Sequence, residues 1–517
     1  MEGYDEVILA ALLKQNRGSI AGVIARKFLI FLHRWLGLAF CLLFLTWFLS
    51  GVVMMYATYP SVSAKERLDR SEALRSESVQ ISPQDAYLSL KIAQRPKSIV
   101  LINLGGRPAY RFQTRRAVRM VYADNGELAG QVNPVEGAKL AAAWITMPAS
   151  TASFKGTLTE ADQWTLGSQF AALRPLLKFG WPDGEEAYVS VISGEVVQHT
   201  TRTTRALAYL GAIPHWLYFA PLRRNGRLWN KVVIWSSGIG TITSLLGLVV
   251  GILLYSPSKR YLHQGQPSGI PYRGQKHLHV ILGLVFGLVT CSWVFSGLLS
   301  MEPFPWLSDE SNSASLVAEM LQGNDVNPTL FAAKSPHEVL RQVGSAKELE
   351  LIEAAGQPYY VARPSPDVSQ LVPMHGEVFD RFDPKTLRGL VARAVNPAQI
   401  TEAHVMTQYD AYYLDRERQH PLPALFVEIG DVDRSMLYID LKTARLVEAY
   451  GRRSRINRWL YHGLHSWNLP WLYRYRPAWD IFVLLLLAGG IGLSTTSVVL
   501  SVQLIQRKLF VRREHPA

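Results

Sequence analysis

Residues 32–38 read Leu-His-Arg-Trp-Leu-Gly-Leu, and residues 278–284 read Leu-His-Val-Ile-Leu-Gly-Leu. Each stretch opens a long apolar segment. The same offset of 246 positions also aligns Trp47 with Trp293, Ser50-Gly51 with Ser296-Gly297, and Met55 with Met301. Later in the chain an offset of 250 aligns Leu210 with Leu460, His215 with His465, and Trp229 with Trp479. So many matches at nearly one offset indicate an internal duplication.

Four apolar segments are each long enough to cross a hydrocarbon layer of ~30 Å as a helix. We predict transmembrane helices at residues 28–56, 229–255, 277–301 and 479–504. Three shorter segments then share one side of the membrane: residues 1–27, 256–276 and 505–517. Two large polar domains lie on the other side, at residues 57–228 and 302–478. The sequence thus predicts a membrane protein with four transmembrane α-helices in two parallel repeats and two α+β domains.

The orientation follows from the basic residues close to the ends of the predicted helices. The three short segments and the first turns of the first predicted helix carry Lys14, Arg17, Arg26, Lys27, Arg34, Lys259, Arg260, Arg273, Lys276, Arg507, Lys508, Arg512 and Arg513. Lys and Arg are enriched in short cytoplasmic loops. We therefore expect both termini to be cytoplasmic and both large domains to lie outside. The first helix is too long for a cleaved signal peptide and lacks a small-residue cleavage site.

Composition excludes some classes of protein. The 517 residues carry a net charge of +13, which would suit nucleic-acid binding, but no zinc-finger, RRM or helix-turn-helix pattern is present. Membrane topology accounts for much of the basicity, so we expect no nucleic-acid partner. The two cysteines, Cys41 and Cys291, both lie inside predicted membrane helices. The outer domains therefore contain no disulfide, and the thiols are expected to pack.

The outer domains show short alternating segments, such as 110–113, 188–192 and 437–441, separated by turn-forming residues. Short amphipathic helices are predicted at 85–92 and 336–343, before these strands. A helix followed by a small antiparallel sheet is the expected arrangement in each domain.

Histidines at the helix ends are the candidate site residues. His33 and His279 match between the halves at the cytoplasmic side, and His215 and His465 match at the outer side. Neutral imidazole is a good axial ligand of haem iron, and two opposed imidazoles suit electron transfer. The duplication supplies such opposition, so the sequence predicts one inner and one outer haem. No Cys-x-x-Cys-His motif is present, which predicts haem b, held without thioether bonds.

Other interpretations of these histidines stay open. A histidine at a helix end also commonly anchors a protein at the lipid headgroups, as Arg34-Trp35 beside His33 would suggest. His277 and His462 lie two and three residues before proposed ligands. Either could replace the neighbouring ligand, bind a haem propionate, or contact the ligand on the side away from the metal.

Three other features of the sequence give weaker signals. The Ser50-Gly51 and Ser296-Gly297 pairs are expected to serve helix packing rather than a cofactor. The aromatic and acidic runs at 162–165 and 409–413 are expected to lie in packed domain cores rather than at a ligand. Four arginines could attract an anionic ligand, pair with haem propionates or contact lipid phosphates: Arg202, Arg205, Arg452 and Arg455.

These residues resemble the PepSY-associated transmembrane family. The likeness rests on residues 33–37 (His-Arg-Trp-Leu-Gly), 162–165 (Asp-Gln-Trp-Thr), 211–218 (Gly-Ala-Ile-Pro-His-Trp-Leu-Tyr) and 462–467 (His-Gly-Leu-His-Ser-Trp). It covers roughly residues 26–505. The resemblance implies a bacterial inner-membrane protein with PepSY-like periplasmic domains. Some members are similar to di-haem ferric-siderophore reductases, which implies His33, His279, His215 and either His462 or His465 as haem ligands.

We therefore expect a membrane electron-transfer protein that reduces a ferric siderophore or another iron(III) chelate in the periplasm. No donor domain is fused to the chain, so a quinol or a separate reductase is expected to supply electrons. Two alternatives remain. One is a non-redox, membrane-anchored PepSY module that binds a peptide or an envelope protein. The other is a transporter of iron or its chelate, which the parallel duplication would suit.

Overall fold

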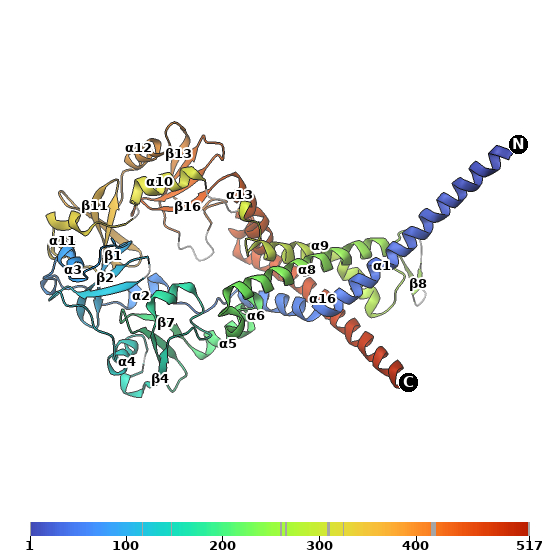
Figure 1. The fold of residues 1–517 in the computed structure, drawn as a ribbon, viewed down its shortest axis with the longest axis horizontal. Helices are drawn as coiled ribbons and strands as arrows, with labels where there is room; N and C mark the ends of the chain where they lie inside the picture. Colours follow the sequence, from blue (N-terminus) through green and yellow to red (C-terminus); the bar gives the residue numbers. More distant parts are fainter. Residues whose placement is uncertain are drawn as a thin grey trace.

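The computed structural model describes residues 2–514, except 116, 146, 259–260, 264–265, 308–310, 324 and 415–419. Side chains are described from residue 22 to residue 507, apart from those gaps and from residues 263 and 266. The molecule is elongated, with a helical bundle at one end and sheets at the other (Figure 1). Several of the basic residues on which the predicted orientation rests lie outside the described side chains, namely Lys14, Arg17, Lys259, Arg260, Lys508, Arg512 and Arg513. His263 and His515 also lie outside the described side chains.

Four long helices form the bundle: α1 (Glu2–Met54), α8 (Gly226–Leu254), α9 (Gln275–Leu299) and α16 (Arg476–Glu514). Their stretches Gly22–Met54, Gly226–Leu254, Gln275–Leu299 and Arg476–Arg507 are long and apolar enough to cross a membrane. At ~1.5 Å per residue, even the shortest spans more than ~30 Å. The prediction of four membrane-crossing helices is confirmed, and the chain is a multi-pass membrane protein.

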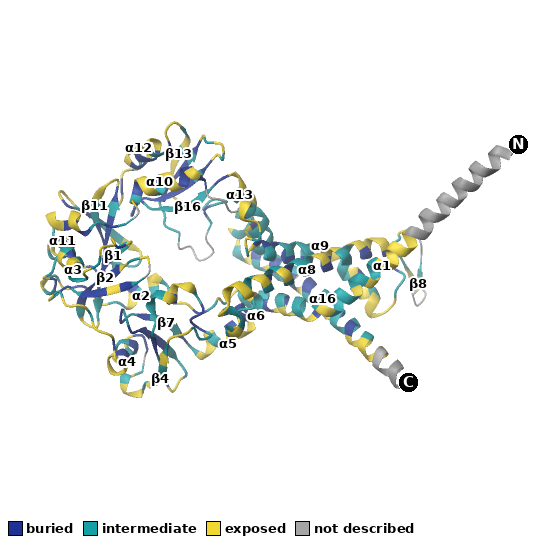
Figure 2. Ribbon diagram, viewed as in Figure 1, coloured by how far each residue is buried: buried dark blue, intermediate teal, exposed yellow. Residues whose placement is uncertain are grey.

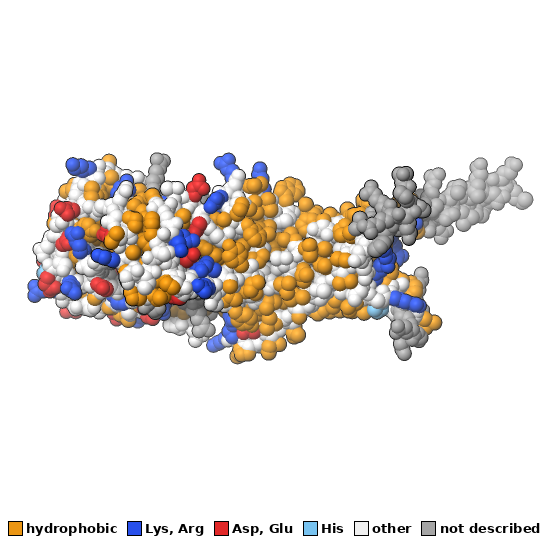
Figure 3. Space-filling model, turned by 90° about the horizontal axis from the view of Figure 1, so that it is seen from below, with side chains coloured by type: hydrophobic (Ala, Val, Ile, Leu, Met, Phe, Trp, Pro, Cys, Tyr) orange, Lys and Arg blue, Asp and Glu red, His pale blue; other side chains and the backbone are white. Residues whose placement is uncertain are grey.

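The outer surface of the bundle is apolar. Leu42, Trp235 and Leu485 are all more than 60% exposed, and the bundle helices present many exposed residues in Figure 2. Figure 3 shows hydrophobic side chains covering the bundle, with Lys and Arg gathered at its two ends. Such a surface is stable against lipid and not against water.

Small residues let the four helices approach closely. A Cβ on Gly490 of α16 would lie 2.5 Å from the ring of Phe48 of α1. A Cβ on Gly240 of α8 would lie 3.0 Å from Phe44. Large side chains at these positions would separate the helices, because membrane helices associate through close packing.

The segment between α1 and α8 contains short helices and seven strands. The helices are α2 (Ala64–Arg70), α3 (Pro83–Ser89) and α4 (Pro134–Ala142). The strands are β1 (Ser98–Leu104), β2 (Arg107–Gln113), β3 (Val118–Tyr122), β4 (Ser153–Leu158), β5 (Leu176–Gly180), β6 (Glu186–Ser190) and β7 (Val196–Thr200). Asn133 caps α4 by accepting hydrogen bonds from the backbone of Val135 and Glu136, which fixes its start.

The segment between α9 and α16 has a similar order of elements. Its helices are α10 (Asn312–Gln322), α11 (Pro336–Val343) and α12 (Pro384–Val395). Its strands are β10 (Glu348–Ala354), β11 (Gln357–Ser365), β12 (Val368–Pro373), β13 (Ile400–Met406), β14 (Ala424–Ile429), β15 (Met436–Asp440) and β16 (Leu446–Tyr450). Between α8 and α9 lies a two-stranded hairpin, β8 (Tyr261–His263) with β9 (Gln266–Ser268).

The strands form a six-stranded antiparallel sheet in the order β12-β11-β10-β1-β2-β3 and two four-stranded sheets, β4-β5-β6-β7 and β13-β14-β15-β16. The six-stranded sheet joins the two segments, because β1 pairs with β10 and aligns Leu101 with Leu349. The expectation that each outer domain forms its own sheet is therefore wrong for the six-stranded sheet, which both segments share. Each segment contributes three strands to a common sheet, whose core includes the fully buried Tyr110 and Tyr360.

Short helical connectors lie between the sheets and the bundle (Figure 1). The first comprises α5 (Arg202–Leu210), α6 (Ala212–Trp216) and α7 (Ala220–Arg223). The second comprises α13 (Arg452–Arg458), a π-helical turn (Trp459–Gly463), α14 (Leu464–Ser466) and α15 (Pro470–Tyr473). Each reverses direction at a residue with positive φ, Leu217 (φ 53°) in the first and Trp467 (φ 51°) in the second. These turns direct the preceding histidines, His215 and His465, toward the bundle.

Candidate functional site

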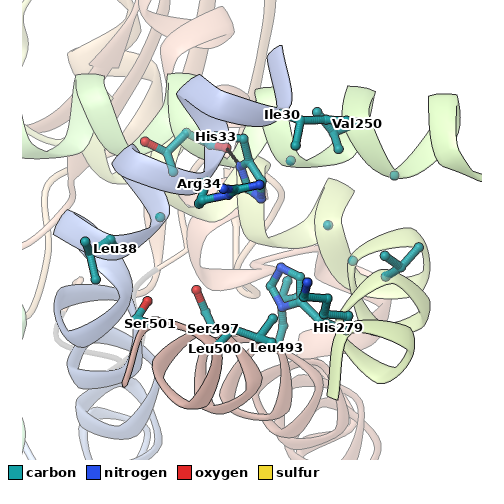
Figure 4. Close-up of a pocket in the computed structure, with 18 of the residues that line it drawn as sticks. Ile30, His33, Arg34, Leu38, Val250, His279, Leu493, Ser497, Leu500 and Ser501 are labelled. Carbon is teal, nitrogen blue, oxygen red and sulfur yellow. Dashed lines mark hydrogen bonds between the residues drawn. The ribbon is translucent and has the colours of Figure 1, made fainter. Parts of the chain in front are cut away.

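Two of the predicted histidines face each other inside the bundle. The imidazole rings of His33 on α1 and His279 on α9 have centroids 6.3 Å apart and planes inclined by 29°. We call them the first histidine pair. Figure 4 shows the two rings on opposite sides of a cavity, with Ser497 of α16 also at its wall.

The other predicted pair lies at the sheet-bearing end of the bundle. The centroids of His215 on α6 and His465 on α14 are 6.0 Å apart, and their planes are inclined by 70°. We call them the second histidine pair. Metal–imidazole bonds measure about 2 Å, so two imidazoles on opposite sides of one metal ion have centroids about 6 Å apart. Both pairs have the spacing of two axial ligands.

Hydrogen bonds fix the tautomer of the second pair. The Ser50 hydroxyl donates to the carbonyl of Trp47 at 3.1 Å, so its oxygen accepts from Nδ1–H of His215 at 3.1 Å. In the other half, the Ser296 hydroxyl donates to Trp293 O at 3.0 Å and accepts from His465 Nδ1–H at 3.1 Å. With the proton on Nδ1, the lone pair of Nε2 is available to a metal.

The first pair is held in the same way. Nδ1 of His33 donates to the backbone carbonyl of Thr243 at 3.2 Å. Nδ1 of His279 lies 2.9 Å from Oγ1 of Thr496, whose hydroxyl donates to Leu493 O at 2.7 Å. Among the described residues, none hydrogen-bonds to Nε2 of either ring. Metal-ligating histidines characteristically donate their other ring N–H to such an outer group.

The cavity between His33 and His279 has a volume of about 330 Å³. That size falls within the range of cofactor sites, ~300–1,000 Å³. Five glycines line it, which leaves flat wall space between the helices: Gly37, Gly247, Gly251, Gly283 and Gly287. Gly247 is required for this shape, because a Cβ there would lie 2.6 Å from Cε1 of His33.

The cavity wall combines apolar, polar and basic side chains. Leucine, valine and isoleucine line it together with serine and threonine, and three basic residues also line it, namely Arg34, Lys276 and Arg507. Figure 4 shows Arg34 next to His33. A flat apolar ligand that carries carboxylates at one edge would match this distribution, since guanidinium and ammonium groups pair with carboxylates.

The structure separates the alternatives for His277 and His462. His277 lies outside the first pair, with Nδ1 donating to Tyr272 O at 3.1 Å. His462 packs on the ring of Tyr461 at 4.4 Å, while His465 is the residue that faces His215. The geometry therefore favours His279 over His277, and His465 over His462, as members of the pairs.

The expectation that the Ser-Gly pairs serve helix packing alone is wrong for their serines, because Ser50 and Ser296 hold the second histidine pair. The glycines lie beside the same rings. A Cβ on Gly297 would be 3.4 Å from Cε1 of His465, and one on Gly51 would be 3.8 Å from Cε1 of His215. Their recurrence at one offset was the sequence signal that could have identified them. Thr243 gave no such signal, since it acts through its backbone.

Residues 162–165, the first acidic and aromatic run, hydrogen-bond to the strands around them and to the first connector. Asp162 accepts hydrogen bonds from Tyr188 Oη at 2.8 Å and from Lys178 Nζ at 3.2 Å. Burial, reinforced by Asp162, raises the pKa of Tyr188, so its hydroxyl stays a donor. The amide of Gln163 donates to Tyr218 O at 2.7 Å, close to His215 in the chain. Residues 162–165 thus have a structural role.

The run at 409–413 has the corresponding role in the second half. Asp410 accepts from Tyr438 Oη at 2.9 Å, and Tyr412 Oη lies 3.1 Å from Nε1 of Trp459 in the π-helical turn. The roles left open for the four arginines stay open, but two of these arginines have partners within the protein. Arg205 contacts Thr200 Oγ1 at 2.9 Å, and Arg455 donates to Arg434 O at 3.0 Å.

Within the part of the chain that the structure describes, no group of three or more His, Cys, Asp or Glu side chains is arranged to hold a metal ion. Paired imidazoles fit a metal whose remaining ligands come from elsewhere, as in a tetrapyrrole.

The comparisons with known proteins agree with the architecture. The search of curated proteins found no match. The family model for the PepSY-associated TM region matches residues 30–500, a range that covers most of each of the four membrane helices and both histidine pairs. The protein therefore belongs to the PepSY-associated transmembrane family.

Proposed function

We propose that this protein is a di-haem electron-transfer protein of the bacterial inner membrane that reduces an iron(III) chelate, such as a ferric siderophore, in the periplasm. The observation that carries the proposal is the opposition of His33 to His279 and of His215 to His465, with ring centroids 6.3 and 6.0 Å apart. Every one of these rings has its Nδ1 occupied by a hydrogen-bond acceptor.

The residues fit haem b. His33 and His279 would hold one haem, and His215 and His465 the other. Each haem, when bound, supplies one-electron redox chemistry. The chain fixes the ring orientation through Ser50, Ser296, Thr243 and Thr496. At the first site leucine, valine and isoleucine side chains would contact the haem ring, and the three cations that line the cavity would be available to propionates.

The proposed orientation places the sheets in the periplasm and both termini in the cytoplasm. It rests on the basic residues of the terminal segments and of the α8–α9 connection. The matched contacts of His215 and His465 support a parallel internal repeat, in which each half contributes one ligand to each site. The two sheet-bearing segments would be the PepSY-like domains.

Reduction would release iron because siderophore oxygens are hard ligands and iron(II) prefers softer ones. A quinol or a separate reductase would supply the electrons. The second histidine pair is closest to the sheets, so the iron chelate would approach from that side.

An absorption spectrum tests the proposal. Purified protein from haem-replete cells should show a dithionite-reducible, low-spin b-type spectrum, with about two haems per chain by pyridine haemochrome. His33→Ala or His465→Ala should each remove about one haem, whereas His277→Ala and His462→Ala, the neighbouring controls, should remove none. A colourless preparation would overturn the proposal.

The alternatives predict different results. A non-redox module would keep its partner binding in the His33→Ala and His465→Ala variants. A transporter would move iron or its chelate into sealed vesicles without a reductant. Either result, together with the absence of haem, would favour that alternative.

A further inference from the structure

A buried arginine lies on the connector that carries the second histidine pair. Arg458 is the last residue of α13, directly before the π-helical turn, and is only 5% exposed. The connector then continues to His465. A guanidinium is always charged in proteins, so it requires polar partners when it is buried.

The partners of Arg458 are incomplete. Nη2 donates to Asn468 O at 3.0 Å, and the guanidinium carbon lies 4.5 Å from the ring centre of Trp459. Nη1 is buried and has no hydrogen-bond partner among the described residues. No carboxylate in the described part of the chain forms an ion pair with it. A buried charged donor left unsatisfied is strongly unfavourable, which points to a ligand that would complete it.

The free nitrogen lies close to the glycine that separates His462 from Leu464. Nη1 is 3.8 Å from the point where a Cβ on Gly463 would be. Gly463 directly follows His462 and precedes His465 by two residues. The ring of Tyr461 packs against the rings of His462 at 4.4 Å and His465 at 5.7 Å. The unsatisfied donor is thus on the same short segment as the metal-binding candidates.

The cation is specific to one half of the molecule. At the offset of 250 that matches His215 with His465, Ala208 occupies the position of Arg458, and it is 1% exposed. Ala212 likewise occupies the position of His462. The first connector packs without a cation at this position, so a buried arginine is not a common requirement of the two connectors.

We propose that Arg458 binds a carboxylate group of the ligand at the second histidine pair. Guanidinium–carboxylate hydrogen bonds are strong and directional, and one carboxylate oxygen would satisfy Nη1. The inference rests on the proposed function for the identity of that ligand. The carboxylate has two potential sources, a haem propionate or a carboxylate of the iron chelate.

The experiment uses the full-length chain, depleted of haem, in detergent. The His33→Ala/His279→Ala background leaves only the second site. The His33→Ala/His279→Ala protein, here called the parent, and the same protein with Arg458→Gln are each titrated with haem, with haem dimethyl ester and, separately, with citrate. Arg455→Gln is the matched control, because Arg455 lies on the same helix and donates to backbone carbonyl oxygens.

If a propionate is the partner, the parent should bind haem about tenfold to a hundredfold more tightly than the ester, and Arg458→Gln should lose this preference. If the chelate supplies the carboxylate, Arg458→Gln should weaken citrate binding by a similar factor and leave haem affinity unchanged. Arg455→Gln should behave like the parent in both titrations.

Equal affinities of the parent and Arg458→Gln for all three ligands would overturn the inference. Absence of haem binding to the parent and to the unsubstituted chain would instead refute the proposed function, while the citrate titration would still test Arg458. Arg458→Lys keeps the charge and should retain part of the preference. If Arg458→Gln fails to fold, Arg458→Lys alone decides: a preference equal to that of the parent would contradict directional recognition by the guanidinium.

Discussion

The hydroxyl of Ser50 lies 3.1 Å from Nδ1 of His215, although 165 positions separate the two residues. Ser296 and His465 repeat this contact at the same distance. In each case the serine also donates to a backbone carbonyl, so its oxygen accepts the imidazole proton, and the lone pair of the ring stays on Nε2. The histidines are therefore oriented by groups on a different helix.

Removing this hydroxyl should weaken the second site. Ser50→Ala and Ser296→Ala should each lower haem affinity there by roughly tenfold, the lower end of the range for outer-group substitutions. The loss stays partial because Trp47 O and Trp293 O remain within 3.2 Å of the rings. Titration of the depleted protein measures it. Ser292→Ala, which removes a hydroxyl bonded only to Val289 O, should leave the affinity unchanged.

Gly247 makes the first site possible by leaving room for His33. In Gly247→Ala the new Cβ would approach Cε1 of His33 to 2.6 Å, so the ring must turn away. Overpacking typically costs about 1–3 kcal/mol, which corresponds to roughly a fivefold to hundredfold loss of affinity. The first-site spectrum should weaken while the second remains. Gly238→Ala on the same helix, with nothing within 4 Å, is the control; equal spectra in the two variants would contradict this role of Gly247.

Glu350 should make the sheets sensitive to acid. Burial opposes its ionisation, but Arg363 at 2.6 Å and Arg445 outweigh this and hold its pKa below the ordinary value of 4.5. A carboxyl whose pKa is lower in the folded state stabilises the protein above its unfolded pKa, and this contribution is lost as the pH falls through the folded pKa. The free energy of unfolding should thus decrease below about pH 4.5.

Glu350→Gln tests that assignment. Removing one member of a buried ion pair costs about 3–5 kcal/mol at neutral pH. The variant should also lose this group's share of the acid dependence, so its unfolding midpoint in denaturant should change less between pH 6 and pH 3.5 than that of the parent. Parallel pH profiles would show that other carboxyl groups dominate.

The β1–β10 pairing should make the two sheet-bearing segments unfold together. Leu101 and Leu349 are partners in that register and are both fully buried. Leu101→Ala and Leu349→Ala should each reduce the free energy of unfolding by about 2–5 kcal/mol. Their effects should not be additive, since the side chains share one core. Two separate unfolding transitions in the parent would contradict this coupling.

The sequence predicted the four membrane helices, because long apolar segments are visible in the chain itself. Matched positions in its two halves also indicated that histidines at the helix ends would face each other, although His277 and His279 were not separated. The sequence left His462 and His465 unresolved, since His462 lies in the π-helical turn Trp459–Gly463, which changes which residues share a face with His465. Pairing of β1 with β10 was not predictable, as it joins strands about 250 positions apart whose local patterns specify no partner. The role of Thr243 was hidden because a backbone carbonyl has no sequence signature.

The continuous six-stranded sheet has a mechanical consequence. Alternating-access transporters rock one half of the molecule against the other. Here such rocking would have to break the main-chain ladder between β1 and β10 or bend a packed six-stranded platform. The platform therefore ties the two sheet-bearing segments to each other and opposes such rocking at this end of the molecule.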